Sequence, residues 1–365
     1  MSEFTFTGSE DDDVLSGSNE TADRQRTQVD DIDAQSNATS VYSFKSSRDG
    51  HTLFRLVQGR PFNAQNELYF LPADAIEFQR MERNHLMQLV FLGRLYIEPE
   101  KVQRVLRPTP GEQKRILDLG AGSGSWCIAM AHEFPLAEVI GVDLAPNTSC
   151  VPPPNCRFEF DDFNRGLPHY YGLFDIVHCR SVANGVKDFS WFISECAKCL
   201  KPGGMLLVTE GHQDILNSEK QLQARAYGSG GPGQSWLARA VFESCNIMKR
   251  RGSSVDGRGM LYELMTSCRL LDGVGEKVGY MPIGPWERGS TPDDDQRKQI
   301  LGILTRQVLK ELVRSLEPLF ISERFPRRLI QQFVDGTAEE LNELKEHMYA
   351  RFFYAYGTRN SEGFH

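Results

Sequence analysis

A glycine-rich turn with an acidic residue beside it is the strongest chemical signal in the chain. The stretch LDLGAGSG places Gly120, Gly122 and Gly124 directly after a run typical of a buried strand, and Asp118 stands two residues before the first glycine. Glycine lets the backbone turn sharply at the end of a strand and removes the Cβ atom that would keep a ligand away from it. We therefore expect a ligand to lie against this turn.

The spacing of the glycines argues against a dinucleotide as that ligand. The dinucleotide fingerprint is G-x-G-x-x-G, in which helix amides face a pyrophosphate. Here Ser125 occupies the third required position, and the spacing is G-x-G-x-G. A carboxylate such as that of Asp118 is poorly placed beside a pyrophosphate, but it can hold an ammonium group directly or through water. Unless the glycines serve the turn alone, we expect the ligand to carry a cation near it.

Further carboxylates follow at the ends of the next two predicted strands. Asp143 ends the stretch EVIGVDL, where a carboxylate can accept hydrogen bonds from the vicinal hydroxyls of a ribose. Asp161 and Asp162 end the next strand, where a carboxylate can accept from an adenine amino group while Phe163 covers the ring. Ammonium, ribose and adenine together describe S-adenosylmethionine. Asp143 could instead cap a helix, and the two later aspartates could belong to a solvated turn.

The elements that would position these residues alternate in the manner of a doubly wound α/β fold. Short apolar runs predict strands at 115–120, 138–144, 157–162, 174–179 and 205–211, with helical or loop segments between them. Short continuous apolar runs joined by crossovers are what a parallel sheet covered on both faces requires. The stretch MYARFFYAYGT at 348–358 predicts a final strand.

Five stretches in this order resemble the motifs of class I S-adenosylmethionine-dependent methyltransferases. They are LDLGAGSGSW, EVIGVDL, PPNCRFEFDD, FDIVHCRSV and LKPGGMLLVTEG. More narrowly, YFLPADAIEFQRMERNHLMQLVF and PPNCRFEFDD resemble the LaeA-like methyltransferases of fungi, which are associated with secondary metabolism. The resemblance covers about residues 65–290 and the final strand. It implies a Rossmann-like methyltransferase fold with a seven-stranded, mostly parallel sheet.

The resemblance also implies which residues bind the cofactor, S-adenosyl-L-methionine. Those expected to face its methionine part are Asp118, Gly120, Ala121 and Gly122. Those expected around the ribose and adenine are Asp143, Leu144, Asp162 and Phe163. Arg180 is expected near the cofactor after the fourth strand. Arg83 and His85 on the preceding helix could close the pocket, although a surface ion pair or a core role suits them equally.

Residues that could act on the methyl acceptor follow the fifth predicted strand. A sulfonium methyl group is already activated, so the protein mainly has to align the reacting atoms and exclude water, and a base is optional. Glu210 and His212 stand at the carboxyl edge of the sheet, where open α/β folds bind ligands, and are candidates to serve as base or to orient the acceptor. Arg258 is a candidate for the substrate wall, whereas Trp236 and Trp286 are interpreted as packing residues.

The chain divides into three parts by composition and pattern. Ten acidic residues and two arginines give residues 1–33 a net charge of −8, which equals the formal charge of the whole chain. Residues 1–40 lack apolar periodicity and cannot offset the entropy of ordering, so we expect a disordered acidic tail. A helical extension is expected over 41–110. The methyltransferase domain is expected over 111–365, with a cap insertion at about 211–290.

The helix expected before the glycine turn begins near the sequence LPAD. We expect Pro72 in its first turn, because proline is favoured there. The residues expected on one apolar face are Ile76, Met81, Leu86, Leu89 and Leu92. The later glycine run GSGGPG has no strand before it and is interpreted as a flexible connector.

The composition outside the tail disfavours several kinds of partner. Residues 34–365 carry equal numbers of basic and acidic residues, so no general attraction to nucleic acid is expected. The chain has neither a signal-peptide pattern nor a run of about 18 apolar residues, so we expect no membrane segment and a cytosolic or nuclear location. No metal is expected either, because CAKC at 196–199 has no second pair and Cys196 falls at helical spacing with apolar neighbours.

Three functions remain compatible with these motifs. The first is an enzyme that methylates O, N or C of a small-molecule acceptor. The second is a regulator of secondary-metabolite genes that keeps the cofactor pocket and acts through protein partners, with the acidic tail as an interaction segment. The third is a nucleotide-dependent oxidoreductase, against which Ser125 and Asp118 argue. We favour the enzyme, but the first two share every motif.

The interpretation of the acidic tail leads to a first prediction. A chain lacking residues 1–40 should bind S-adenosyl-L-methionine as tightly as the full chain, because the tail is expected to add nothing to the pocket. Calorimetric titration of both chains tests this expectation. A large loss of affinity in the shortened chain would contradict it.

Overall fold

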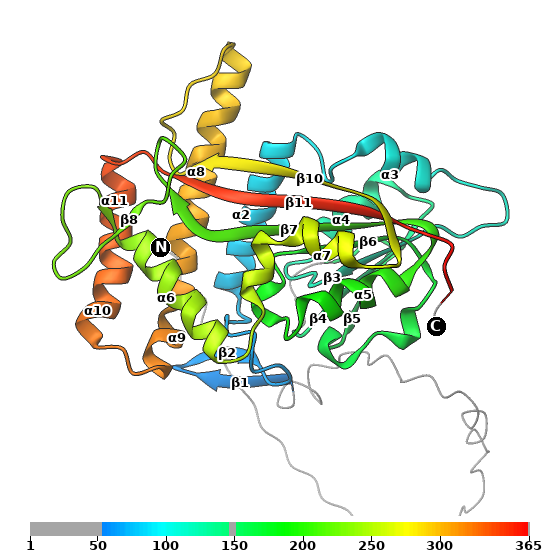
Figure 1. Ribbon diagram of the computed structural model, residues 1–365, viewed down its shortest axis with the longest axis horizontal. Helices are drawn as coiled ribbons and strands as arrows, with labels where there is room; N and C mark the ends of the chain where they lie inside the picture. Colours follow the sequence, from blue (N-terminus) through cyan, green and yellow to red (C-terminus); the bar gives the residue numbers. More distant parts are fainter. Residues whose placement is uncertain (1–52, 146–150, 364–365) are drawn as a thin grey trace, which may run out of the picture. The chain divides into compact units, whose positions relative to one another are not determined.

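The computed structural model describes residues 53–145 and 151–363, and these fall within one unit, Ser40–His365. The predicted acidic tail at 1–40 lies outside the described residues. A seven-stranded sheet forms the core, in the order β10-β11-β7-β6-β3-β4-β5 (Figure 1). Its five parallel strands are β3 (Arg115–Leu119), β4 (Glu138–Asp143), β5 (Cys156–Phe160), β6 (Phe174–Arg180) and β7 (Leu200–Leu216).

Two further strands complete the sheet. β11 (Tyr349–Arg359) lies antiparallel between β7 and β10 (Leu271–Pro282). From β3 the chain moves outward through β4 to β5, then returns to β6 on the other side of β3. Such a reversal creates the crevice in which open α/β sheets bind ligands. The predicted doubly wound, mostly parallel fold is therefore confirmed, as is the final strand.

Strand β10 corrects the predicted extent of the cap insertion. The sequence analysis assigns 211–290 to that insertion, but β10 pairs with β11 along its length and forms an edge of the sheet. An edge strand has a neighbour on one side only, and β10 mixes exposed and buried residues, so it lacks the continuous apolar run of the inner strands. β7 likewise continues to Leu216, beyond its predicted end at 211.

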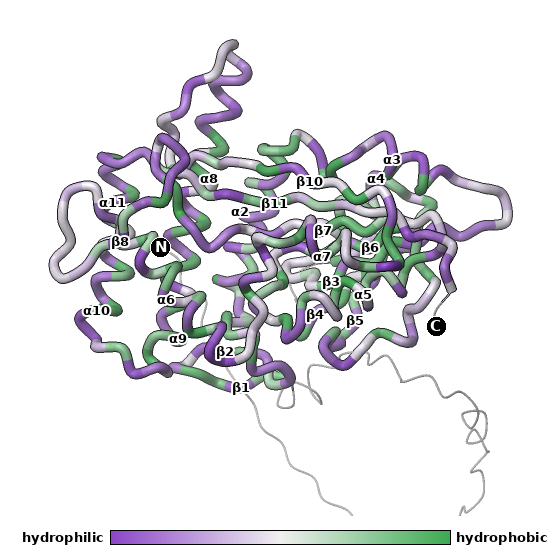
Figure 2. The backbone as a smooth tube through the Cα atoms, viewed as in Figure 1, coloured by the Kyte–Doolittle hydropathy of each residue, from purple (hydrophilic) through white to green (hydrophobic). Residues whose placement is uncertain are grey.

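Helices cover both faces of the sheet. Successive strand residues point to opposite faces, and Ile116 and Leu117 accordingly join two separate apolar clusters. The helices on the Ile116 side include α3 (Pro99–Val105) and α4 (Ser125–Glu133), and those on the Leu117 side are α5 (Phe189–Cys199) and α7 (Leu261–Ser267). Hydrophobic residues are concentrated around the strands and α5 (Figure 2). Cys196 lies in this core, as expected.

Helix α2 (Ala75–Leu92) differs from its prediction in two respects. It begins after Asp74, whose side chain accepts a hydrogen bond from the Glu77 amide, so Pro72 lies before the helix and not in its first turn. The expected apolar face is also wrong in part, because Ile76 and Leu86 are exposed. The buried side carries mainly polar residues, since α2 packs against α8 and faces the cavity described below.

Smaller elements surround this core. The hairpin of β1 (Phe54–Val57) and β2 (Arg60–Asn63) precedes α2, so the predicted helical extension also contains strands. Between β7 and β10 lie β8 (Ala224–Arg225), β9 (Gln234–Ser235), α6 (Trp236–Arg250) and η4 (Val255–Gly259). The C-terminal helices are α8 (Pro292–Ser315), α9 (Glu317–Ser322), α10 (Arg327–Gln331), η5 (Gln332–Gly336) and α11 (Thr337–Glu343). The remaining helical turns are η1 (Phe163–Arg165), η2 (Pro168–Tyr170) and η3 (Ala183–Gly185). Within the described ranges, no helix has the length and apolar character to cross a membrane.

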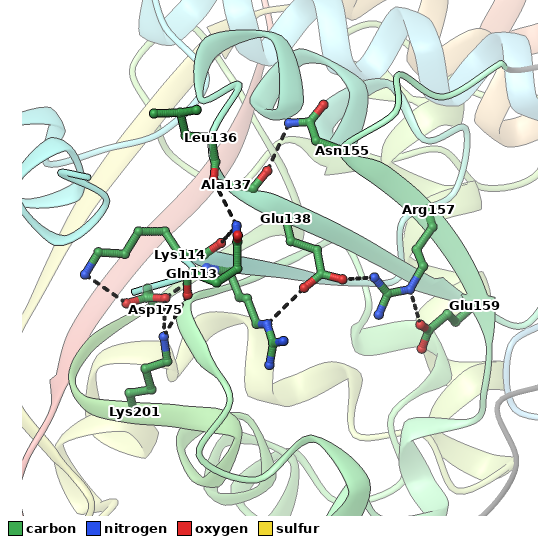
Figure 3. Close-up of polar contacts among 11 residues, drawn as sticks. Gln113, Lys114, Leu136, Ala137, Glu138, Asn155, Arg157, Glu159, Asp175 and Lys201 are labelled. Carbon is green, nitrogen blue, oxygen red and sulfur yellow. Dashed lines mark hydrogen bonds and ion pairs between the residues drawn. The ribbon is translucent and has the colours of Figure 1, made fainter. Parts of the chain in front are cut away.

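Ion pairs hold together the amino ends of the strands, opposite the edge where the predicted site lies (Figure 3). The Asp175 carboxylate pairs with Lys201 at 2.7 Å and with Lys114 at 3.4 Å. Glu138 pairs with Arg115 at 2.9 Å and also with Arg157. These contacts join neighbouring strands and leave the carboxyl ends free for ligand binding.

Glu340 of α11 fixes the start of α6, which supplies part of the cavity wall. Its carboxylate accepts hydrogen bonds from the amides of Trp236 and Leu237, at 2.8 and 2.9 Å, and from the Ser235 hydroxyl. The first amides of a helix have no partner within the helix, so this carboxylate satisfies groups that would otherwise be unpaired.

A second prediction follows from this contact. Glu340→Ala should lower the free energy of unfolding by about 1–3 kcal/mol, because it leaves the two amides without their acceptor. Urea unfolding measures the change. The matched control is Glu339→Ala, on the same helix but exposed, which should change stability by no more than about 0.5 kcal/mol. Equal effects of the two variants would contradict this role.

Candidate active site

A cavity of about 210 Å³ lies at the carboxyl edge of the sheet. Its walls come from the ends of β3, β4, β6 and β7, from helices α2, α6 and α8, and from β11. Among the residues predicted to bind cofactor or acceptor, those in the wall are Gly120, Gly122, Asp143, Leu144, Phe163, Arg180, Glu210, His212 and Arg258. Those outside the wall are Asp118, Ala121, Asp162, Arg83 and His85.

The glycine turn packs too closely for any larger residue. Gly120, Gly122 and Gly124 have φ angles of 81°, 55° and 79°, which favour glycine. A Cβ atom on Gly120 would lie 2.5 Å from Cγ1 of Val182, in the loop after β6. The Gly120 amide donates to the carbonyl of Val142 at 2.8 Å, which fixes the turn beside β4. A Cβ atom on Gly122 would likewise lie 2.9 Å from Sδ of Met81 on α2, so the turn contributes backbone to the cavity wall between these two side chains.

Asp143 joins the end of β4 to this turn. One carboxylate oxygen accepts a hydrogen bond from the Gly122 amide at 2.7 Å, and the other accepts from the Ala145 amide at 3.2 Å. Burial raises the pKa of Asp143 to about 6. A carboxylate has about four lone-pair positions, so these two bonds leave capacity to accept from ligand hydroxyls. Asp143 is not a helix cap, because a bend follows it.

Asp118 lies behind the turn and not in the cavity wall as expected. Asp118 and His178 are paired in register on β3 and β6, which places the Nδ1 atom of His178 2.7 Å from the Asp118 carboxylate. The other carboxylate oxygen is 3.1 Å from the Cys127 thiol. Trp126 stacks on the His178 ring with the ring centres 3.8 Å apart. Asp118 therefore does not line the cavity, where the predicted contact with a ligand ammonium group would require it to be.

Arg180 at the end of β6 reaches the cavity in front of that buried group. Its Nη2 atom lies 3.3 Å from Nδ1 of His85, and burial lowers the pKa of His85 to about 4, so this histidine is neutral. Burial also lowers the pKa of Arg180, while the nearby Asp118 carboxylate acts in the opposite direction and favours the charged guanidinium. His85 and Asp118 thus support Arg180 from behind.

Of the two residues predicted to bind adenine, Phe163 lines the cavity and Asp162 does not. Phe163 lines the cavity and is available to cover a ring. Asp162 is buried, and its Oδ1 atom accepts from the backbone and side-chain nitrogens of Asn164 at 3.1 and 2.8 Å. Asp161 pairs with His169 at 3.3 Å. The Asp162 carboxylate thus holds the loop that presents Phe163, and the solvated-turn alternative is wrong for it.

On α2 the cavity takes different residues from those predicted. Arg83 forms an ion pair with Glu311 of α8 at 2.8 Å, which is the ion-pair alternative. Arg80, Met81 and Asn84 line the cavity instead. The sequence feature that could have predicted these lining residues is the spacing of Arg80 and Asn84, which are one helical turn apart and therefore share a face.

Glu210 holds the loop after β6 against the turn. Its Oε1 atom accepts from the amides of Val182 and Ala183 at 2.7 and 3.1 Å, and its Oε2 atom is 3.9 Å from Nε of Arg258. Burial raises the pKa of Glu210 to about 7. Glu210 therefore positions the loop, and its carboxyl group is only partly ionised near neutral pH.

The Nδ1 atom of His212 lies close to several polar groups. The Arg351 guanidinium lies 2.9 Å from Nδ1, and the Asp214 amide nitrogen lies 3.1 Å from it. The Asp214 carboxylate also lies 3.3 Å from Nδ1, and Nη2 of Arg351 lies 3.5 Å from Nε2, so these contacts fit either tautomer of the neutral ring. Burial and the Arg351 charge lower the pKa of His212, which favours this neutral form. His212 is thus a neutral hydrogen-bonding group in the cavity wall.

Both tryptophans are packing residues, as interpreted from the sequence, whereas Arg351 lines the cavity without having been predicted to do so. Trp236 contacts Phe333, with ring centres 6.4 Å apart, and Trp286 stacks on His347 at 4.5 Å. Arg351 lines the cavity from β11. Its signal in the sequence was a charged residue inside the otherwise apolar final strand.

Comparison with known proteins agrees with this geometry. A family model described as a methyltransferase domain matches residues 91–251. Secondary metabolism regulator laeA of Coprinopsis cinerea is 42% identical over 42% of this chain and 38% of that protein. Methyltransferase str3 of Strobilurus tenacellus is 33% identical over 61% of this chain and 73% of that protein. Secondary metabolism regulator LAE1 of Cochliobolus heterostrophus is 32% identical over 77% and 87%, respectively.

The chain belongs to the S-adenosylmethionine-dependent methyltransferases and, within them, to the LaeA-like group of fungi. S-adenosyl-L-methionine is the methyl donor of this family. The match to the Coprinopsis cinerea protein spans less than half of either chain, whereas the matches to the other two relatives cover most of their lengths.

The burial of Glu210 gives a third prediction. Its pKa is about 7 in the folded chain, against an ordinary value of 4.5, so the folded state binds the proton more tightly. This group must therefore reduce stability as the pH rises from about 4.5 to about 7. Glu210→Gln removes the titration and keeps an oxygen for the two amides. Between about pH 5 and about pH 8 the variant should lose less unfolding free energy than the wild type, by on the order of 1–3 kcal/mol.

Urea unfolding at the two pH values measures this difference. Glu219→Gln, at an exposed position on the loop after β7, is the matched control and should follow the wild type. If Glu210→Gln also followed the wild type, the carboxylate would not titrate near neutral pH.

Proposed function

We propose that this protein is an enzyme that transfers the methyl group of S-adenosyl-L-methionine to a small-molecule acceptor of fungal secondary metabolism. The observation that carries the proposal is a cavity whose wall combines two groups of residues. We assign the part with the glycine turn and Asp143 to the cofactor and the part with His212, Arg258 and Arg351 to the acceptor, and we call them the first and second end. The similarity to methyltransferase str3 supports an enzymatic role.

The residues at the first end fit the cofactor. The turn at Gly120 and Gly122 has no Cβ atoms to exclude it, and the free lone pairs of Asp143 suit the ribose hydroxyls. Leu144 and Phe163 offer apolar surface for the adenine ring. The bound cofactor would supply a methyl group on a sulfonium, which is already activated for transfer.

The charged groups behind the turn suit the methionine part. We assign the Arg180 guanidinium to the cofactor carboxylate, because it lines the cavity from the end of β6, next to β3, whereas Arg80 in the same wall is paired with Glu77. Asp118 would act indirectly, by holding His178 and favouring the charged form of Arg180. This assignment replaces a direct contact between Asp118 and the ammonium group.

The second end would orient the acceptor. Apolar side chains from β7, α6, α8 and β11 line it, among them Ile215, Val241, Leu309 and Phe352. Such a wall binds an apolar skeleton and excludes water from the reacting atoms. His212 would hydrogen-bond to the acceptor, and Glu210 would fix the loop after β6.

A regulatory role is the second candidate, because two of the relatives are named secondary metabolism regulators. In that role the chain would bind cofactor but act through protein partners, and it would be found in the nucleus. Isolation of a stable complex with a transcription factor would favour this role. Turnover of a metabolite by the purified protein would favour the enzyme.

A fourth prediction tests the cofactor assignment. Asp143→Ala should weaken binding of S-adenosyl-L-methionine and S-adenosylhomocysteine about tenfold or more, because it removes an acceptor for the ribose and frees the Gly122 amide. Asp118→Ala should also weaken both, through Arg180. Asp293→Ala, at an exposed position near the start of α8, is the control and should bind as the wild type does. Isothermal titration calorimetry measures all four proteins.

Titration with NAD in parallel separates this assignment from a dinucleotide site. The wild type should bind the two adenosyl ligands and not NAD. Unchanged affinity in both Asp143→Ala and Asp118→Ala would refute the site assignment, and binding of NAD alone would refute the proposed function.

A further inference from the structure

We infer that the acceptor is an acid that binds as its carboxylate anion, held by Arg258 and Arg351. The inference rests on the proposed function, which it deepens by naming the substrate class. Both arginines lie in the cavity wall together with His212. Their side chains are only 12% and 25% exposed, respectively.

Neither guanidinium has a carboxylate at hydrogen-bond distance. Nε of Arg258 is 3.9 Å from Glu210 and has no hydrogen-bond partner, while its Nη1 atom faces only the Cys245 thiol, at 3.8 Å. Arg351 lies 3.8 Å from Asp214, donates to the neutral His212 ring, and also has an unpaired Nε. Both therefore retain donors for an anion.

Three other partly buried arginines have close carboxylate partners, whereas Arg55 lies 3.7 Å from Glu67 and also has unpaired nitrogens. Arg60 donates to Asp74 at 2.7 and 2.9 Å, Arg80 donates to Glu77 at 2.6 Å, and Arg83 donates to Glu311 at 2.8 Å. A guanidinium removed from water is stabilised by such a pair and is costly without one. Arg258 and Arg351 lack such a carboxylate pair, so the carboxylate of a bound acceptor would supply the missing partner.

Three segments that are distant in the sequence converge here. Arg258 comes from η4, Arg351 from β11 and His212 from the carboxyl part of β7. A Cβ atom on Gly259 would lie 3.0 Å from Nε2 of His212, which shows how closely η4 approaches that ring. Arg258 and Arg351 thus lie next to His212, the residue proposed to orient the acceptor.

The carboxylates near these arginines neutralise them incompletely. Glu210 uses Oε1 for two backbone amides, and its raised pKa of about 7 leaves it partly protonated near neutral pH. Asp214 is nearer to His212, at 3.3 Å, than to Arg351. The adjoining wall is apolar, including Ile215, Val241 and Phe352. The end as a whole therefore suits an apolar skeleton that carries a carboxylate.

The fifth prediction compares acids with their neutral amides on the wild-type protein. The protein is first titrated with S-adenosylhomocysteine and then, saturated with it, with benzoate, phenylacetate and octanoate and with the three matching amides. At least one acid should bind about tenfold or more tightly than its amide, because only the anion can pair with the guanidinium groups. Absence of any preference for the acids would overturn the inference.

Variants assign the preference to particular side chains. Arg258→Gln and Arg351→Gln should each reduce the affinity for that acid about tenfold and leave its amide unaffected. Arg351→Lys should retain part of the preference, since it keeps the charge. Arg288→Gln removes the same charge from a side chain that is 71% exposed and should bind as the wild type does. Retained preference in both glutamine variants would overturn the inference.

The first titration separates the two levels of the argument. If S-adenosylhomocysteine failed to bind, the proposed function would fail, and this inference with it. If it bound with similar affinity to the wild type and all variants while no acid was preferred, only the acidic acceptor would be refuted. Similar cofactor affinity would also show that the variants are folded and that neither arginine serves the cofactor.

Discussion

The cavity depends on the close approach of two loops at the carboxyl edge of the sheet. A Cβ atom at position 120 would lie 2.5 Å from Val182, so only glycine allows the turn after β3 to meet the loop after β6. Two buried carboxylates hold this arrangement, Asp143 by accepting from the Gly122 amide and Glu210 by accepting from Val182 and Ala183. Burying a carboxylate is unfavourable unless it is hydrogen-bonded, and the raised pKa values of both groups show that part of this cost remains.

The position of the site could be predicted because it follows from local patterns. Parallel strands present their carboxyl ends at one edge, so residues that follow different strands are brought together whatever the details of packing. Gly120, Asp143, Phe163 and His212 were expected on this basis and Arg180 from the family resemblance, and all five line the cavity. The glycine spacing carried further information, because together with Asp118 it argued against a dinucleotide ligand.

The remaining features depend on contacts between segments far apart in the sequence. Asp118 turns away from the cavity because the register of β3 and β6 places His178 beside it. α2 buries polar residues because it contacts α8, more than 200 residues later, and no periodicity within α2 encodes that partner. Arg351 reaches the cavity only because β11 lies next to β7. β10 gains its partner in the same way, which explains why it was assigned to an insertion.

The protonation of His212 connects the acceptor end to the chemistry. Nη2 of Arg351 lies 2.9 Å from Nδ1 of His212 and 3.5 Å from Nε2, and burial and the Arg351 charge lower the pKa of the ring, which makes it a weak base. Glu210 is committed through Oε1 to two backbone amides. An acceptor that arrives as an anion needs no base, since its nucleophilic lone pair is already free. Arg351, which lowers the pKa of His212, would then also bind that anion, so a single residue from β11 would connect the weak base with the choice of acceptor.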